Sequence, residues 1–273
     1  MDLKPTYVFA LQQEAYPFIE QLKVKQIHQQ KNIRLYANDH SFLLITGIGS
    51  IACSTAVGWF LALHKNVVMW NIGCAASQAN LHKWQRIIEV KNKELTFYPE
   101  LIGKSEFELN SLNTVSDFVG VEDLMSYGNE LVDMEGISFA KAAQLFLNSN
   151  QIQIFKWVSD AGHKDFYKDG TWFKKYERQI PEIITVVDLE TKLISTEVNA
   201  IFKNTNQFVS KIDNLLKLSF TQKEQLNKAC LCFLAYKTEL QLAELIEEFT
   251  DSVENISQRK SLLNQLLEKL RHV

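Results

Sequence analysis

Hydrophobic residues follow two alternating patterns along the first 160 residues. Short apolar runs predict strands, and segments with apolar residues three or four positions apart predict helices. We predict strands over Tyr7–Ala10, Phe42–Thr46, Val67–Asn71, Ile87–Val90, Leu112–Val115 and Ile152–Ser159, and helices over Ile51–His64 and Glu135–Leu147. Strands that alternate with helices predict an α/β sheet with helices on both faces.

The pattern changes after about residue 165. The segment Gly170–Tyr176 is aromatic and basic, Pro181 suits the first turn of a helix, and 182–203 has mostly helical spacing. The sequence therefore predicts that the α/β domain spans residues 1–203.

From residue 204 to residue 273 the spacing predicts an all-helical extension. We place its helices near 206–218, 222–249 and 252–271, and two of these begin with patterns typical of capping boxes, Thr221-x-x-Glu224 and Asp251-x-x-Glu254. The leucines of this segment offer more apolar surface than isolated helices can leave in water. We therefore expect the extension to pack on the α/β domain or on a partner chain.

Composition limits the kinds of ligand and partner. The chain has 273 residues, 46% of them hydrophobic, and a formal net charge of −3, so a large core is expected without an electrostatic basis for binding nucleic acid or an anionic membrane. No apolar run approaches the roughly 18 residues of a membrane span, and the start lacks the pattern of a signal peptide. We expect a cytoplasmic protein that binds a small polar molecule.

Cysteine and histidine patterns give no indication of a metal site. The four cysteines show no CxxC spacing, and the histidines lack the i, i+4 pairing typical of zinc ligands. His163 alone lies near the predicted site, where it either touches a ligand or is a solvated loop residue. The sequence predicts no bound metal and no cofactor.

Four short motifs follow in a fixed order. They are Ala10-Leu-Gln-Gln-Glu14 after a strand, Thr46-Gly-Ile-Gly49 between a strand and a helix, Asp133-Met-Glu135 at a helix start, and Val158-Ser-Asp160 at a strand end. Together they resemble the nucleoside phosphorylase and nucleosidase superfamily, and most of all its methylthioadenosine/S-adenosylhomocysteine nucleosidases. The resemblance implies a phosphorylase-like three-layer αβα fold with a central mixed sheet.

The resemblance assigns roles to acidic residues. Cleaving an N-ribosidic bond needs a proton for the leaving base, a held sugar and an activated water, all of which carboxyl groups can supply. By resemblance, Glu14 is the general base for water, Asp160 protonates the purine, Glu135 accepts hydrogen bonds from ribose hydroxyls and Met134 packs beneath the ribose. As a general acid Asp160 must hold its proton near neutral pH, so we expect apolar surroundings, with Trp157, Val158 and Phe118 as candidates.

Further positions complete the site that the resemblance implies. Phe118 and Val119 match the pair that contacts the base, Ser159 precedes the catalytic aspartate, and Lys156 stands where relatives carry an arginine near the water. Cys74 replaces a serine in a turn beside the sugar. In the same region Ala76 replaces a glycine, and Trp84-Gln85 stands where relatives have Gly-Asp, so this part of the wall is altered.

Each acidic residue also has a structural interpretation. Glu14 and Glu135 suit the positive end of a helix dipole, and Asp160 suits the start of a turn. Phe118 and Val119 fit an ordinary core equally well.

Three functions therefore remain open at this point. The first is a nucleosidase that hydrolyses a purine nucleoside or thionucleoside. The second is a non-catalytic nucleoside-binding or protein-interaction module, and the third is an atypical phosphorylase. Relatives that use phosphate hold it with arginines, where this chain has Gln12-Gln13-Glu14 and Asn71, so water is the consistent nucleophile. By analogy we expect a homodimer, in which the second subunit completes the pocket for the ribose 5′ group.

Overall fold

The computed structural model describes residues 2–102, 105–162, 171–234, 237–252 and 259–271. The chain divides into two compact units, Met1–Ser195 and Thr196–Val273. The boundary that we expected after residue 203 falls inside one helix, Thr171–Leu216. The observed boundary between the two units, after Ser195, falls inside the same helix. The segment from Asn204 to Leu216 is therefore the end of this long helix rather than a separate one.

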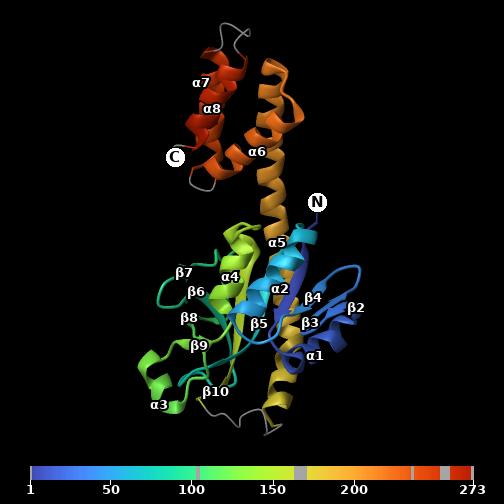
Figure 1. Ribbon diagram of the computed structural model, residues 1–273, viewed down its shortest axis with the longest axis vertical. Coiled ribbons are helices and arrows are strands. Elements are labelled where there is room, and N and C mark those ends of the chain that lie inside the picture. Colours follow the sequence, from blue (N-terminus) through green and yellow to red (C-terminus); the bar gives the residue numbers. More distant parts are fainter. Residues whose placement is uncertain (1, 103–104, 163–170, 235–236, 253–258, 272–273) are drawn as a thin grey trace. The chain divides into compact units, whose positions relative to one another are not determined.

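The first unit is a mixed sheet with helices (Figure 1). Its strands are β1 (Lys4–Phe9), β2 (Lys25–Gln30), β3 (Ile33–Ala37), β4 (Phe42–Ile45), β5 (Val67–Ala76), β6 (Trp84–Lys91), β7 (Thr96–Phe97), β8 (Glu108–Thr114), β9 (Leu131–Asp133) and β10 (Ile152–Asp160). Its helices are α1 (Gln12–Leu22), α2 (Ser50–Leu63), α3 (Val121–Leu124), α4 (Gly136–Gln144), the short η1 (Met125–Tyr127) and η2 (Ser149–Gln151), and the first part of α5 (Thr171–Leu216).

The sheet has ten strands in the order β10-β6-β8-β9-β5-β1-β4-β3-β2, with β7 paired to β6. Strand β10 pairs with both β5 and β6, so that β5, β10, β6, β8 and β9 close into a ring. Strands β4, β1, β5 and β10 are mutually parallel neighbours. Their carboxyl ends therefore lie at one edge, where loops can gather functional groups.

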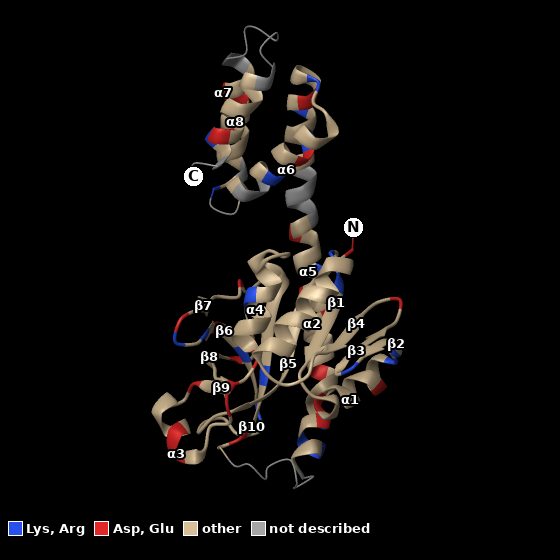
Figure 2. Ribbon diagram, in the orientation of Figure 1, with Lys and Arg blue, Asp and Glu red and all other residues tan. Residues whose placement is uncertain are grey.

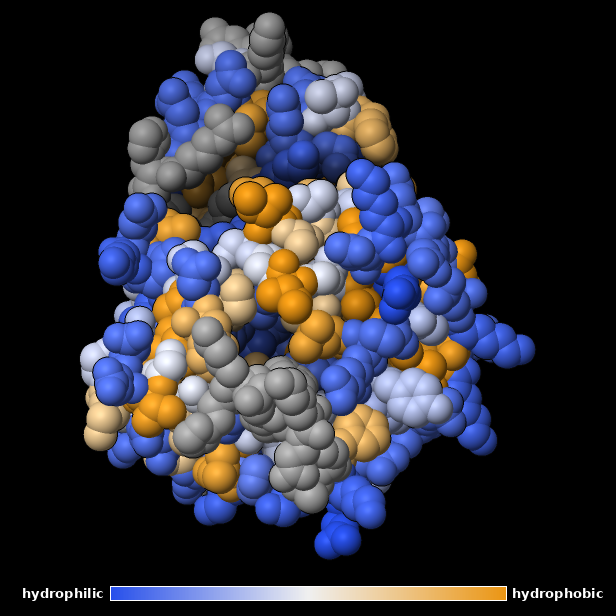
Figure 3. Space-filling model, turned by 60° about the horizontal axis from the view of Figure 1, so that its bottom comes forward, coloured by the Kyte–Doolittle hydropathy of each residue, from blue (hydrophilic) through white to orange (hydrophobic). Residues whose placement is uncertain are grey.

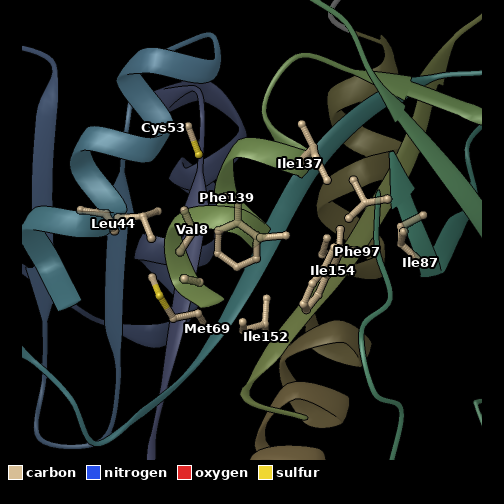
Figure 4. Packing of buried hydrophobic residues seen from close by; sticks show 14 of the residues in the cluster. Val8, Leu44, Cys53, Met69, Ile87, Phe97, Ile137, Phe139, Ile152 and Ile154 are labelled. Carbon is tan, nitrogen blue, oxygen red and sulfur yellow. The ribbon is translucent and has the colours of Figure 1, made fainter. Parts of the chain in front are cut away.

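Helices cover both faces of this sheet, as the strand and helix pattern predicts. On one face α2 and α4 pack over the largest core cluster, to which Val8, Met69, Phe139 and Ile154 contribute (Figure 4). On the other face, rings from α1 and α5 meet those of β1, since Phe18 lies 5.8 Å from Tyr7 and 6.3 Å from Tyr176 between ring centroids. The unit is a three-layer αβα structure, as expected.

Three local predictions need correction. Strand β5 continues five residues beyond Asn71, to Ala76, because β10 pairs with it as far as Asp160. Gly73 and Cys74 are thus strand residues and not a turn after the strand. Pro181 lies inside α5 and does not open it.

The second unit contains the rest of α5 together with α6 (Phe220–Leu234), α7 (Glu239–Ser252) and α8 (Arg259–Arg271). It has its own core, which includes Ile212, Leu226, Leu242 and Leu266. The helix predicted over 222–249 is wrong, because it is two helices, α6 and α7.

Two capping boxes begin these helices. Ser219 with Gln222 caps α6, and Thr238 with Gln241 caps α7. The box expected at Thr221 therefore lies two residues too late. Of the second expected box, Asp251 lies in the last turn of α7, and Glu254 is outside the described residues. The side chain of Cys232 is not described either.

Acidic and basic residues are interspersed along the ribbon of the first unit (Figure 2). Within the described residues, no helix is long and apolar enough to cross a bilayer.

Candidate functional site

A pocket opens at the carboxyl ends of the parallel strands. Eight of the nine predicted site residues line it: Glu14, Cys74, Phe118, Val119, Met134, Glu135, Ser159 and Asp160. A hollow on this face has hydrophilic residues at its floor and hydrophobic residues along its border (Figure 3). The structure thus brings together segments that are up to 146 residues apart in the chain, from Glu14 to Asp160.

Glu14 lies in the first turn of α1 with its side chain buried. Its Oε1 accepts a hydrogen bond of 3.0 Å from the backbone N–H of Cys74, and its Oε2 lies 3.1 Å from where a Cβ on Gly73 would be. Burial raises the pKa of Glu14, against the opposing effect of the Cys74 N–H and the charge of Lys156. Strand β5 therefore holds a basic carboxylate at the floor of the pocket, and glycine leaves room for it.

Glu135 occupies the N-cap position of α4, between β9 and the helix. Its Oε1 accepts a hydrogen bond of 2.6 Å from the N–H of Gly49, whose φ of +92° in the turn before α2 is a conformation that favours glycine. Burial and the charge of Asp133 raise the pKa of Glu135 to about 7, although Lys156 and Gly49 oppose this shift. With a pKa of about 7, this carboxyl group changes its protonation state around neutral pH.

Lys156 does not line the pocket but lies beneath it. Its Nζ forms a buried ion pair of 2.9 Å with Oδ2 of Asp133. Burial alone would lower the pKa of Lys156, but the charges of Asp133 and Glu135 outweigh burial and raise it. One lysine thus balances several neighbouring carboxylates, and it acts on Glu14 through its charge.

Asp133 was not among the predicted site residues, although it belongs to the Asp-Met-Glu motif. Besides pairing with Lys156, it accepts hydrogen bonds from the Thr114 hydroxyl at 2.9 Å and from the Gly136 N–H. It therefore joins β8, β10 and the start of α4. The three-residue motif could have identified Asp133 as a site residue. Its pairing with Lys156, 23 residues further along, leaves no pattern in the sequence.

The expectation of largely apolar surroundings for Asp160 is met only in part, because Phe118 lines the same pocket but polar groups contact the carboxylate. Its carboxylate accepts hydrogen bonds from the Ser159 hydroxyl at 2.8 Å and from the Gly162 N–H at 2.7 Å. Trp157 packs against Trp172 and Tyr176 and does not line the pocket. The reason is strand alternation, which directs Trp157 to the α5 face of the sheet.

Phe118 and Val119, which follow β8, line the pocket. Phe118 is 46% exposed, so it is not an ordinary core residue. Cys74 also lines the pocket, next to Glu14, and burial together with this carboxylate raises the pKa of its thiol.

Several positions named in the sequence lie elsewhere. Trp84 packs on Tyr176, and the Gln85 side chain forms hydrogen bonds with those of Glu108 and Asn110. Neither residue lines the pocket. Asn71 is buried in β5. His163 lies outside the described residues.

The charge of the pocket lining is acidic. Among the described residues that line it are Glu14, Asp117, Asp133, Glu135 and Asp160, and none is lysine or arginine. The described residues also contain no cluster of three or more His, Cys, Asp or Glu side chains suited to a metal ion. A dianion such as phosphate would meet repulsion here, whereas a neutral, hydroxyl-rich ligand would not.

Solved structures of nucleosidases share this fold. A 5′-methylthioadenosine nucleosidase from Arabidopsis thaliana is 15% identical, with a TM-score of 0.56, and the match covers 68% of this chain and 97% of that one. A 5′-methylthioadenosine/S-adenosylhomocysteine nucleosidase from S. pneumoniae, solved with a transition-state inhibitor, is 16% identical with a TM-score of 0.54, covering 70% and 100%. A futalosine hydrolase mutant of Helicobacter pylori is 16% identical with a TM-score of 0.52, covering 68% and 99%.

No protein-family model and no curated protein matches the chain. The structural matches confirm the phosphorylase-like αβα fold that the motifs predicted. They span nearly the whole of those proteins but only 68–70% of this chain.

Proposed function

We propose that this protein is a nucleosidase that hydrolyses the N-ribosidic bond of a purine nucleoside or thionucleoside. The observation that carries the proposal is the meeting of Glu14, Glu135 and Asp160 around one pocket on a fold shared with nucleosidases. The order of motifs along the chain supports the same roles for these three residues.

The proposed reaction divides its tasks among these residues. Water adds to the anomeric carbon while the bond to the base nitrogen breaks, and the bonding electron pair leaves with the base. Glu14 takes a proton from the water, for which its raised pKa makes it a stronger base. Asp160 donates a proton to the departing base, and Glu135 accepts hydrogen bonds from the ribose hydroxyls.

Water is the proposed nucleophile rather than phosphate. The acidic lining described above opposes a phosphate dianion, and Glu14 lies where it can orient a water molecule instead. Cys74 and Met134 border the sugar in this arrangement, and Phe118, Val119 and Ser159 border the base.

The test is release of free base from a panel of purine nucleosides and thionucleosides, with and without phosphate. The proposal predicts release that does not depend on phosphate. Glu14→Gln should abolish hydrolysis yet leave ligand affinity nearly unchanged, because the amide keeps the shape but cannot take the proton. Glu20→Gln, the same change at an exposed position of α1, serves as the control with full activity. Phosphate-dependent release would indicate a phosphorylase instead.

A second candidate is a non-catalytic nucleoside-binding module. The observation that favours it is the hydrogen bonding of Asp160, which accepts from Ser159 and Gly162 where a proton donor is needed. Nucleoside binding without any release of base would support this candidate and contradict hydrolysis.

We also propose that the active form is a homodimer located in the cytoplasm, with no metal or cofactor required. Sedimentation of the full chain with and without ligand tests the dimer.

A further inference from the structure

The turn of α1 that carries Glu14 is weakly held by the helix itself. Leu11, at the N-cap position, has no polar side-chain group that could bind the free N–H groups of this turn. Pro17 lies inside α1 and has no N–H, so the carbonyl of Gln13 loses the partner that a helix normally supplies four residues on. Contacts from outside the helix therefore fix the position of Glu14.

Neighbouring elements supply such contacts. From β3, Nη1 of Arg34 donates a hydrogen bond of 2.6 Å to Oε1 of Gln12. From β5, the Cys74 N–H donates to the Glu14 carboxylate at 3.0 Å. From α5, the hydroxyl of Tyr176 donates a hydrogen bond of 3.1 Å to the backbone carbonyl of Glu14, which lies 162 residues earlier in the chain. Tyr176 thus holds the backbone of the residue whose carboxylate β5 holds.

Tyr176 is itself held in place by packing. It is fully buried, and its ring centroid lies 5.3 Å from that of Trp157 in β10 and 5.4 Å from that of Trp84 in β6. Phe18 in α1 and Trp172 in α5 add rings at 6.3 Å and 5.8 Å. Close packing of this kind leaves the hydroxyl little freedom to move. The hydroxyl of Tyr176 therefore has a fixed place beside the first turn of α1.

The same packing includes the strand that binds the carboxylate. Trp157 is the cross-strand partner of Cys74, and its ring lies edge-on to that of Tyr176. A shift of Tyr176 relative to β5 would therefore displace Trp157 as well. The two anchors of Glu14, one for its carbonyl and one for its carboxylate, are thus parts of one packed unit.

We propose that Tyr176 is a positioning residue for Glu14, and that its hydroxyl keeps the carboxylate aligned with the attacking water. The inference rests on the proposed function, in which Glu14 takes a proton from that water. Without the hydroxyl, the first turn of α1 can move away from β5, and the hydrogen bond from the Cys74 N–H weakens. Tyr176 does not line the pocket, so substrate affinity does not depend on it directly. The loss falls on the chemical step, because general-base catalysis requires close alignment of the reacting groups.

Tyr176→Phe tests the proposal, because it removes the hydroxyl and keeps the ring. We expect kcat for release of base to fall about three- to tenfold with KM nearly unchanged, which corresponds to the net contribution of one hydrogen bond. Tyr7→Phe is the matched control. Tyr7 is also fully buried, and its hydroxyl donates to Oδ1 of Asp188 in α5, at 3.5 Å, rather than to the turn of α1. Both variants lose a buried hydroxyl between the sheet and α5, but only Tyr176→Phe should lower kcat.

A second readout does not require activity. In the full chain prepared with isotope-labelled cysteine, Tyr176→Phe should move the amide proton resonance of Cys74 to lower chemical shift, because its hydrogen bond to Glu14 weakens. Tyr7→Phe should leave this resonance in place. An unmoved Cys74 resonance in Tyr176→Phe, the same movement in Tyr7→Phe, or an unchanged kcat would each overturn the inference. The expected movement with no release of base by the wild type would overturn only the proposed hydrolysis.

Discussion

The ammonium of Lys156 lies 2.9 Å from a carboxylate oxygen of Asp133, and both side chains are at most 3% exposed. The charge of Asp133 raises the pKa of Lys156, and the charges of Glu135 and Glu14 add to this effect. The proposed site is therefore built on an internal ion pair, of which Asp133 lines the pocket and Lys156 does not.

Lys156→Met should destabilise the protein by about 3–5 kcal/mol, because it leaves the Asp133 carboxylate buried without its partner. Urea unfolding measures the change, and Lys83→Met at an exposed position should stay within about 0.5 kcal/mol of wild type. Adding Asp133→Asn to Lys156→Met should recover part of the loss. A loss below about 1 kcal/mol in the single variant would show that the pair is unimportant for stability.

Asp160→Asn should slow release of base from purine nucleosides by about 10²- to 10⁴-fold, the usual contribution of one acid–base group. A nitrophenyl riboside, whose leaving group needs no proton, should be affected much less. Asp117→Asn changes another carboxyl group of the same pocket and should have a small effect on both substrates. Equal losses on the two substrates after Asp160→Asn would assign Asp160 to binding or folding.

Glu135 should make stability depend on pH. Its pKa is about 7 in the folded chain, above the ordinary 4.5. The folded chain holds this proton more tightly than the unfolded chain, so the stabilisation is complete below about pH 4.5 and is lost as the pH rises through about 7. The loss is on the order of 3 kcal/mol.

Glu135→Gln should remove that part of the pH dependence, as measured by urea unfolding between pH 4 and pH 8. Exposed Glu20→Gln should leave the wild-type profile unchanged. An identical slope in wild type and Glu135→Gln would contradict the assignment.

Gly136→Ala should cost about 1–3 kcal/mol through overpacking. A Cβ at Gly136 would lie 2.6 Å from Cδ2 of Leu112 and 3.0 Å from Cγ2 of Val90, in the core at the start of α4. Gly58→Ala within α2 meets no atom within 4 Å and should stabilise the protein by about 0.5–1 kcal/mol. Thermal unfolding compares the two, and equal shifts would argue against the crowding at Gly136.

Leu226→Ala should destabilise the second unit by about 2–5 kcal/mol, because Leu226 is fully buried in α6. Leu240→Ala in α7 removes the same atoms from a residue that is 69% exposed and should have little effect. Helix content followed by circular dichroism during urea unfolding measures both. Random-coil amide shifts in the helices of this unit would contradict the helical structure itself.

Strands that are apolar over several residues were predicted because their burial leaves a local record. β1, β4 and β10 lie over or close to the apolar runs that we identified. In contrast, β2 is exposed throughout and has no apolar run, so its pairing with β3 left no pattern to detect. The break between α6 and α7 was also missed, because helical spacing continues across it.

The candidate site shows the same division. The acidic motifs at strand and helix ends were visible because turns place such residues at the edge of a sheet. The neighbours of each carboxylate could not be predicted, because the pairing of strands determines which residues lie beside it. Strand order brings Lys156 to Asp133, and side-chain alternation directs Trp157 away from Asp160. The sequence alone determines which chemical groups each position carries. The charges and hydrogen bonds around those groups come from segments far apart in sequence, and only the folded sheet brings these segments into contact.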